Sequence, residues 1–537
     1  MRCGDADFFA QGFRPLWTRG RQGGAGTGGC PKTSGLDQGA AAPSGNSGAD
    51  GRRAGRGEFS EAHVTGSAAG GAGPQGGKGR SGTPEGNTSC CLFRKRCYNT
   101  NKNICSYYGE GRTFLMERRI LHADFNGFYA SVACLLNPAI RERPVAVAGD
   151  PAARHGIILA KNEIAKRYGV QTGEVLWQAR QKCPGLVTVA PDFPSYHRFS
   201  ELGREIYAAY SDRVEGFGLD ENWIDVTGST RDFQDAERMA QTIRRRVRAE
   251  LGITVSIGVA DNKVFAKLGS DMRKPDAVTV VSPGNYRETA WKLPVGDLLY
   301  VGRATEAKLR RFGITTIGEL ARAPVGFLRG QFGKIGPMLS DFANGRDRSE
   351  VMRISDTRRV KSVSNGVTTP RDLISDADVR LTVAMLSESV AARLRALGLR
   401  ARTVQLSVRD QALNTINRQC RLEKPTCLTT ELAGSAMALF TAAYDWRLPV
   451  RSLTVGTADL VDGEFPEQLS LFADEARRRR LEQAERAVDG IRSRFGYHAI
   501  GRALFLTDRS IGRLNPQQEN TVHPVGFLHG GIGGGEQ

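Results

Sequence analysis

The sequence predicts an α+β protein of the broad α/β class, with a split β-α-β sheet, a helical segment and a second α/β unit. Three observations support this prediction. A buried strand pattern at 118–125 is followed by a helical pattern at 127–136. Two short strand patterns flank the acidic turn LDE at 219–221, and strands alternate with helices again from residue 358 to residue 460. Alternating two-residue and 3.6-residue periods of this kind are typical of mixed sheets with packed helices.

Residues 1–115 differ in composition from the rest of the chain. They hold 26 of the 64 glycines and show neither hydrophobic period. Such a segment buries too little apolar surface to offset the entropy lost on ordering. Two interpretations stay open: the segment is a disordered extension, or translation begins at Met116. We favour a start at Met116 and exclude residues 1–115 from the fold prediction in either case.

From residue 118 the order of elements is that of a split β-α-β sheet with its helices on one face. Asp232 is placed to cap a long helix, and Gly169 is placed to end a short one. The expected strands are 118–125, 143–149, 156–160, 213–218, 222–228, 253–260 and 277–281, and the expected helices are 127–136, 162–170, 195–210, 232–252 and 262–274.

The second half of the chain contains a helical segment, a linker and a new α/β unit. Residues 298–322 predict two short helices around a glycine turn, and the charged residues 345–359 are typical of a linker. The α/β unit has expected strands at 360–368, 403–410, 416–422 and 452–460 and expected helices at 376–397 and 430–443. A helix rich in Arg and Glu is expected at 474–495, before a Gly-rich tail.

The charge balance indicates a polyanionic partner. The chain has 75 Lys and Arg residues against 57 acids, a net charge of +18, which favours nucleic acid or an anionic membrane over a merely basic soluble protein. No apolar run reaches the roughly 18 residues that span a bilayer, and no signal peptide is visible. We expect a cytoplasmic protein without a membrane span. The cysteines at 134, 183, 420 and 427 lack zinc-site spacing and are expected to be reduced thiols.

Three carboxylates are the main candidates for chemistry. Asp124 ends the first strand, and Asp220 and Glu221 lie at the hairpin turn, so a split β-α-β sheet can bring them to one edge. Adjacent carboxylates repel each other unless a dication neutralises them, and oxygen ligands suit Mg²⁺. Two Mg²⁺ ions roughly 4 Å apart can activate an attacking hydroxyl and stabilise a leaving pyrophosphate. On spacing alone, an ordinary acidic turn is the commoner explanation of LDE.

The strings ADFNGFYASV, GLDENWIDVTG and VSIGVADNKVFAKLGSDMRKP together resemble Y-family DNA polymerases, and most of all the bacterial damage-inducible polymerase IV group. The resemblance covers residues 118–460. It implies a template-directed DNA polymerase of low fidelity, without proofreading, that acts in translesion synthesis and DNA repair on primer-template DNA and dNTPs. It also implies a right-hand architecture, with a palm (116–129 and 192–281), fingers (130–191), a helix-hairpin-helix thumb (282–350), a linker (351–357), a little finger (358–462) and a tail (463–537).

The resemblance assigns roles to individual residues. Asp124, Asp220 and Glu221 become the ligands of two Mg²⁺ ions, with the backbone carbonyl of Phe125. Tyr129 becomes a steric gate against ribose, and Phe128 packs beside it, although both aromatics also have a plain core interpretation. Lys274 becomes a triphosphate ligand. Relatives carry a Tyr and an Arg where this chain has Glu163 and Lys166, so Lys161 and Lys166 are the remaining candidates for nucleotide binding.

Contacts with DNA and with a bacterial sliding clamp are also implied. The string VGRATEAKL resembles a helix-hairpin-helix turn in which Gly302 meets a phosphate. The candidate residues for gripping the duplex are Arg358, Arg359, Lys361, Arg400, Arg402, Arg418 and Arg421. The string QLSLF, in which Gln468, Leu469, Leu471 and Phe472 are the anchors, matches a clamp-binding peptide. We expect a monomer. A catalytically silent DNA-binding scaffold and a nucleotide cyclase are the rival interpretations, and the intact acids argue against the first of them.

Overall fold

The computed structural model describes residues 117–150, 154, 156–356, 359–463 and 474–516. The expectations for residues 1–115, Met116, Arg358 and the anchors at 468–472 therefore lie outside the described residues.

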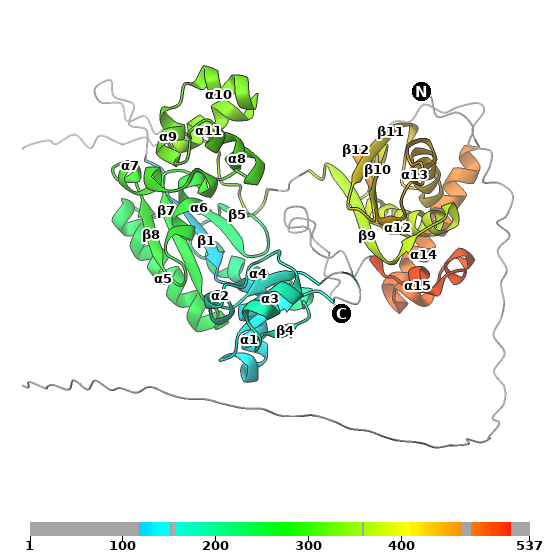
Figure 1. The fold of residues 1–537 in the computed structure, drawn as a ribbon, viewed down its shortest axis with the longest axis horizontal. Helices are drawn as coiled ribbons and strands as arrows, with labels where there is room; N and C mark the ends of the chain where they lie inside the picture. The colour runs from blue at the N-terminus through cyan, green and yellow to red at the C-terminus, as the bar shows by residue number, and fades with distance from the viewer. Residues whose placement is uncertain (1–116, 151–153, 155, 357–358, 464–473, 517–537) are drawn as a thin grey trace, which may run out of the picture. The chain divides into compact units, whose positions relative to one another are not determined.

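A five-stranded sheet lies at the centre of the first part of the chain, in the order β5-β6-β1-β7-β8 (Figure 1). Strand β1 pairs antiparallel with both β6 and β7, and β7 pairs parallel with β8. The bounds are β1 Ile120–Phe125, β5 Val214–Gly216, β6 Glu221–Asp225, β7 Val255–Ala260 and β8 Val278–Val281. The order β7-β1-β6-β5, with its two crossing helices, is the predicted split β-α-β arrangement.

The helices α4 (Phe193–Ala208) and α5 (Phe233–Leu251) cover one face of this sheet. Their apolar side chains pack against alternate residues of β1, such as Leu121 and Ala123. The predicted cap of α5 is confirmed, because the Asp232 side chain accepts a hydrogen bond of 2.8 Å from the backbone N–H of Asp235. This interaction satisfies one of the unpaired donors of the first helical turn.

Helix α6 (Lys263–Met272) corrects the prediction that all helices lie on one face. It packs on the opposite face, the one that carries Asp124, and its Ser270 hydroxyl lies 2.9 Å from the Nδ1 atom of His122 on β1. Close approach is possible because β7 has Gly258 here: an added Cβ atom would lie 1.9 Å from the carbonyl oxygen of Ala266. The 3.6-residue period correctly predicted helix α6. Which face of the sheet this helix covers depends on its close contact with β7 at Gly258.

A small three-stranded sheet, β3-β2-β4, follows helix α1 (Phe128–Leu136). The expected strands at 143–149 and 156–160 and the short helix are present, and Gly169, at φ 80°, follows the helix end as predicted. Strand β4, which pairs parallel with β2, and helix α3 were not predicted. The bounds are β2 Val145–Ala148, β3 Ile158–Lys161, β4 Val187–Val189, α2 Glu163–Arg167 and α3 Leu176–Lys182.

A helical segment comes next and shares a core with β1, β6 and α6. The two helices predicted around a glycine turn are α8 (Arg303–Arg311) and α9 (Ile317–Arg322), with Gly313 at φ 75°. Helices α10 (Val325–Phe332) and α11 (Ile335–Ala343) complete the segment. A short helix, α7 (Tyr286–Thr289), precedes it.

The residues after α11 are more ordered than the predicted linker. Val351 is fully buried in the core shared with β1, and the backbone N–H of Met352 donates to the Glu215 carboxylate at 3.1 Å. The same carboxylate pairs with Lys263 at 2.7 Å. The start of the predicted linker is therefore held against the five-stranded sheet.

The second α/β unit contains a four-stranded antiparallel sheet in the order β11-β10-β12-β9. Helices α12 (Asp376–Ala396) and α13 (Thr429–Ala443) cover one face of it. The strands are β9 Ser362–Leu373, β10 Leu399–Asp410, β11 Thr415–Thr426 and β12 Val450–Asp462. All six elements predicted for this unit are present.

Residues 474–516 belong to this unit and do not form a separate tail. Helix α14 (Glu475–Phe495) presents Glu485 and Asp489 to Arg395 of α12, and Asp489 Oδ2 lies 2.6 Å from Arg395 Nε. Ile511 of α15 (Arg509–Gly512) is fully buried in the core of the unit. Composition alone did not reveal this docking, because the helix contacts its unit mainly through charged side chains.

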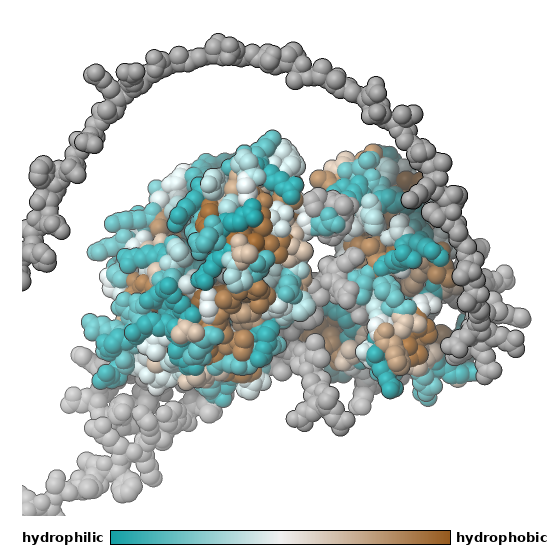
Figure 2. All heavy atoms as spheres, turned by 90° about the horizontal axis from the view of Figure 1, so that it is seen from below, coloured by the Kyte–Doolittle hydropathy of each residue, from teal (hydrophilic) through white to brown (hydrophobic). Residues whose placement is uncertain are grey.

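Hydrophilic side chains cover much of the surface shown in Figure 2, and apolar side chains gather in separate patches. Among the helices in the described ranges, none combines the length and apolar content needed to cross a bilayer. Cys134, Cys183, Cys420 and Cys427 are free thiols, as predicted.

Candidate active site

The pairing of β1 with β6 brings the predicted acids together. Asp124 lies directly opposite Glu221 in the antiparallel register, so the two side chains leave the same face of the sheet. Asp220 immediately precedes β6, and its carbonyl oxygen accepts a hydrogen bond of 3.1 Å from the backbone N–H of Phe125. The three acids therefore lie together at neighbouring ends of β1 and β6, as predicted.

Two lysines of α6 and the loop after it neutralise part of this negative charge. Lys274 Nζ lies 2.7 Å from Asp124 Oδ2 and 2.7 Å from Asp271 Oδ1. Lys267 Nζ lies 2.5 Å from Glu221 Oε2. Within the described part of the chain, no three His, Cys, Asp or Glu side chains are arranged closely enough to hold a metal ion. Asp124 and Glu221 are thus each paired with an ammonium group.

Burial and neighbouring charges shift the pKa values of all three acids. Burial, followed by the charges of Asp124 and Glu221, raises the pKa of Asp220 to about 7. Burial also raises the pKa of Asp124, although Lys274 opposes it. Burial disfavours the ionised form of Glu221, but contacts with His122 and Lys267 outweigh it and lower that pKa to about 2. The carboxylate oxygens are the ligand type that a divalent cation prefers, and in this structure Lys267 and Lys274 occupy the positions beside them.

Sequence reasoning missed His122 and Lys267. His122 is fully buried, and its Nε2 atom lies 3.2 Å from Glu221 Oε2. It stands two residues before Asp124, a spacing that places both side chains on one face of a strand. The spacing i, i+4, i+7 of one helix face relates Lys267, Asp271 and Lys274. This spacing is the feature of the sequence that could have placed Lys267 beside the acids.

The predicted aromatic pair splits into two environments. Phe128 is 3% exposed and stacks on Phe125, with ring centroids 5.2 Å apart, so it lies in the core as its plainer interpretation held. Tyr129 is half-buried and stacks on Tyr196. Phe193 meets the Tyr129 ring edge-on at 6.1 Å. Burial, and then the charge of Asp220, raises the pKa of Tyr129 to about 12, so its hydroxyl is protonated at neutral pH.

The lysines proposed for the fingers lie around β3 and α2. Lys161 ends β3 and donates to the Thr172 hydroxyl at 3.1 Å. Burial and the charge of Lys166 lower its pKa. Lys166 is exposed and lies 3.4 Å from Glu163 of the same helix. Neither lysine contacts the acids in any of the interactions described.

The basic residues expected to grip duplex DNA do not form one surface. Arg418 lies opposite Leu406 in the β11–β10 register, on the face covered by helices, whereas Arg421 lies opposite Thr403 on the other face. Arg400 pairs with Glu482 of α14 at 2.9 Å, and Arg359 donates to the carbonyl of Leu460. Arg402 lies on β10 and Lys361 directly precedes β9. Gly302 is the residue directly before α8, and its contact with a DNA phosphate stays a prediction.

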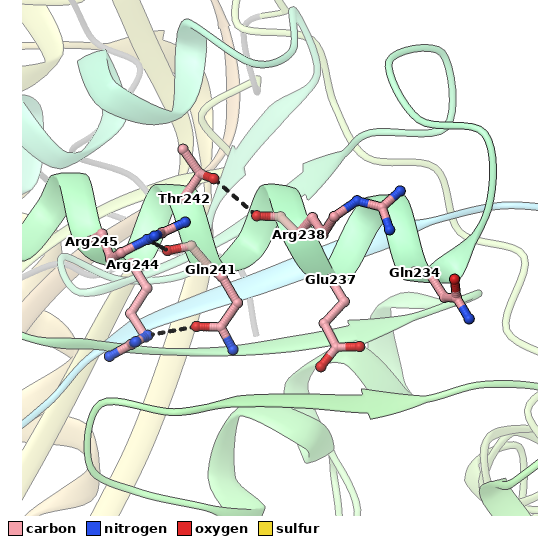
Figure 3. Close-up of a pocket in the computed structure, with 7 residues that line it drawn as sticks. All are labelled: Gln234, Glu237, Arg238, Gln241, Thr242, Arg244 and Arg245. Atoms are coloured by element: carbon pink, nitrogen blue, oxygen red, sulfur yellow. Dashed lines mark hydrogen bonds between the residues drawn. The ribbon is translucent and has the colours of Figure 1, made fainter. Parts of the chain in front are cut away.

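A separate surface depression lies on α5 and does not belong to this site. Its lining residues all come from that one helix and include Glu237, Arg238 and Arg244 (Figure 3). Arg244 donates to Gln241, and Arg238 pairs with Asp235 at 3.1 Å. None of the acids on β1 and β6 lines it. The strand ends therefore remain the candidate active site.

Comparison with known proteins agrees with this fold and this arrangement of acids. The family model of the impB/mucB/samB family matches residues 123–271, and the model of its C-terminal domain matches residues 360–471. A DNA polymerase IV of Acetivibrio thermocellus is 49% identical over 399 residues, which are 74% of this chain and 100% of the relative. The DNA polymerase IV 2 of Bacillus subtilis is 35% identical over 400 residues, 73% of this chain and 96% of the relative.

A solved Y-family DNA polymerase chimera has the same fold, with a TM-score of 0.58 and 20% sequence identity over 64% of this chain and 99% of that one. Fold, acids and relatives together define a DNA-directed DNA polymerase of the translesion type. The chain belongs to the Y family of DNA polymerases, in the impB/mucB/samB family and the polymerase IV group. The resemblance predicted from its motifs is therefore confirmed, and the family implies a divalent metal ion.

Proposed function

We propose that Asp124, Asp220 and Glu221, with the backbone carbonyl of Phe125, hold two Mg²⁺ ions with which the enzyme adds dNTPs to a primer 3′ end. The observation that carries this proposal is the opposition of Asp124 and Glu221 across β1 and β6, beside an Asp220 carboxyl whose pKa is raised to about 7. A donor set of this charge is stabilised by bound cations more than by any neutral ligand.

When bound, such ions activate the primer 3′-hydroxyl and stabilise the charge on the leaving pyrophosphate. The side chains prepare that step. Asp124 and Glu221 orient the reacting groups from one face of the sheet. Lys274, now paired with Asp124 and Asp271, offers an ammonium group to a phosphate oxygen as a point charge. Burial lowers the pKa of Lys274, but the two carboxylates outweigh it and raise that pKa above its ordinary value, so the group is charged at neutral pH.

Sugar selection is assigned to Tyr129. Its ring lies against Tyr196 and Phe193, so it cannot turn away from a larger sugar without disturbing both neighbours. Phe128 supports the same helix from the core. Lys161 and Lys166 add positive charge on the nucleotide side and attract the triphosphate without the two-pronged grip of arginine.

Duplex binding is assigned to Gly302 at the start of α8 and to the basic residues of the second α/β unit, which include Lys361, Arg402 and Arg421. Arg358, outside the described residues, stays in this set, as do Arg359, Arg400 and Arg418. Sliding-clamp docking is assigned to Gln468, Leu469, Leu471 and Phe472, between the end of β12 and the start of α14. The enzyme acts as a monomer in the cytoplasm.

Primer extension tests the proposal. The wild-type chain and the Asp124→Asn and Glu221→Gln variants are compared on intact and damaged templates with Mg²⁺. Both variants keep the size of the side chain but remove its charge. We expect at least a 100-fold loss of extension, on the order of that seen when a group that stabilises a transition state is removed, with DNA affinity retained. Extension at wild-type rates by either variant would refute the assignment of that acid.

A further inference from the structure

Asn126 connects the strand that carries Asp124 to the loop that carries Lys274. It directly follows β1 and is 6% exposed. Its Oδ1 atom accepts a hydrogen bond of 2.8 Å from the backbone N–H of Asp276. Its Nδ2 atom donates to the hydroxyl of Ser256 on β7 at 2.8 Å. One side chain thus joins the end of β1 to β7 and to the loop at Asp276, each more than a hundred residues further along the chain.

The backbone of Asn126 is fixed as firmly as its side chain. Its N–H donates to the carbonyl of Thr254 at 2.9 Å, and its carbonyl accepts from the Ser131 hydroxyl at 2.6 Å. The orientation of the amide is set by its partners, because a backbone N–H can only donate and must therefore meet the oxygen atom. Both polar ends of the side chain are satisfied within the protein, as a buried amide requires.

The other side of the loop is held by α5. Arg244 donates to the carbonyl of Asp276 at 3.2 Å, and Arg248 pairs with its carboxylate at 3.2 Å. Asp276 has φ 54°, a left-handed conformation that costs energy for a residue other than glycine and persists when its surroundings hold it. The loop is therefore fixed between β1 and α5, and Lys274, two residues earlier, reaches Asp124.

We propose that Asn126 is a positioning residue that sets the place of the Lys274 ammonium group relative to Asp124. It thereby fixes the distance between the triphosphate and the metal-binding acids. This inference rests on the proposed function of Lys274 as a triphosphate ligand. Asn126 itself touches no reacting atom, and it acts through its hydrogen bond with the Asp276 N–H, which holds the loop.

The test separates KM for dNTP from kcat in single-nucleotide incorporation by the full chain at saturating primer-template. Asn126→Ala removes both side-chain hydrogen bonds, and loss of the one that holds the loop should raise KM about tenfold, with kcat changed much less. Asn126→Asp keeps an acceptor for the Asp276 N–H and should stay close to wild type. Ser256→Ala removes only the other partner and is the matched control, also with an unchanged KM. Asn126→Ser, which is too short to reach both partners, gives the same readout if the alanine variant does not fold.

Lys274→Ala separates a failure of the inference about Asn126 from a failure of the proposed function of Lys274. We expect it to raise KM, and we expect the Asn126→Ala/Lys274→Ala double variant to be no worse than Lys274→Ala alone, because both act on one group. If Lys274→Ala raises KM but Asn126→Ala does not, the inference about Asn126 is wrong. If Asn126→Ala, Asn126→Asp and Ser256→Ala raise KM equally, Asn126 has only a packing role. An unchanged KM in Lys274→Ala would refute the proposed function of that lysine, and the inference with it.

Discussion

The aromatic rings of Tyr129 and Tyr196 lie nearly parallel, with centroids 4.2 Å apart and planes inclined by 16°. Tyr196 is 1% exposed and comes from α4, more than sixty residues away in the sequence. Stacking at this separation restricts rotation of the half-buried Tyr129 ring. If Tyr129 selects the sugar as proposed, Tyr196 contributes to that selection by holding its ring.

We expect Tyr129→Ala to admit ribonucleotides, because a clash of about 1–3 kcal/mol between ring and 2′-hydroxyl disappears. Tyr196→Leu should show a smaller loss of selection, since the Tyr129 ring is still present but can tilt. Tyr196→Phe keeps the stacked ring and serves as the control. The ratio of kcat/KM for dGTP to that for GTP measures each effect. Selection that is unchanged in Tyr129→Ala would assign the gate to another residue.

Asp220→Asn should stabilise the metal-free protein above pH 7 while abolishing extension. The folded-state pKa of Asp220, about 7, lies above its ordinary value of 3.8. The folded protein therefore binds the proton more tightly than the unfolded chain does, and stability falls as pH rises from about 4 to 7. Asparagine removes the buried charge responsible for that fall. Thermal melts in EDTA at pH 5 and pH 8 test this, with Tm at pH 8 expected to rise by several degrees.

Stabilisation of the wild-type protein by Mg²⁺ should increase as the pH rises and Asp220 loses its proton. In the wild-type protein, Mg²⁺ should raise Tm more at pH 8 than at pH 6, because at pH 6 it competes with the proton on Asp220. In Asp220→Asn this pH dependence should largely vanish. An equal Mg²⁺ effect at both pH values in the wild type would contradict the raised pKa.

Replacing both Glu485 and Asp489 by alanine should strongly destabilise the second α/β unit. Arg395 is 7% exposed and pairs with both acids, so their removal leaves a buried charge without its counterions, at a cost of about 3–5 kcal/mol. Arg486→Ala, an exposed change on the same helix, is the control and should be nearly neutral. Urea denaturation of the two variants gives the comparison. A double variant as stable as the control would show that α14 contributes little to the unit.

Replacing Gln468, Leu471 and Phe472 by alanine should abolish clamp-stimulated synthesis and spare basal extension. Leu471 and Phe472 are the proposed apolar anchors, each worth roughly 2 kcal/mol when fully buried in a partner. An alternative is that they pack on their own chain. That alternative requires a lower Tm and reduced basal activity without the clamp, whereas docking leaves both unchanged. Stimulation that survives the triple replacement would end the docking assignment.

The meeting of the three candidate acids could be predicted because each stands at a strand end that local patterns define. Asp124 ends a buried run and Asp220 precedes a hairpin strand, so period and turn position placed them together, whereas their role as metal ligands was predicted from the family resemblance. Lys267 could not be assigned in the same way. Its contact with Glu221 depends on which face of the sheet α6 covers, and a 3.6-residue period does not contain that information.

The same limit explains the errors in domain boundaries. Residues 345–359 look like a linker because many of them are charged, yet Val351 is buried and the Glu215 carboxylate accepts a hydrogen bond from the backbone N–H of Met352. Helix α14 looks like a solvated tail because its contacts with α12 are ionic. In both places a segment of largely charged composition makes tertiary contacts, and composition cannot distinguish such contacts from exposure to solvent.

Gly258 has an implication for genetic screens of this enzyme. Any side chain there would collide with the backbone of α6, since a Cβ atom would lie 1.9 Å from the Ala266 oxygen and 2.5 Å from the Ser270 nitrogen. A missense allele at this codon would displace the helix that delivers Lys267 and would score as null, like an allele of Asp124. Ranking alleles by loss of function alone would place Gly258 among the reacting groups, although it has no side chain with which to react.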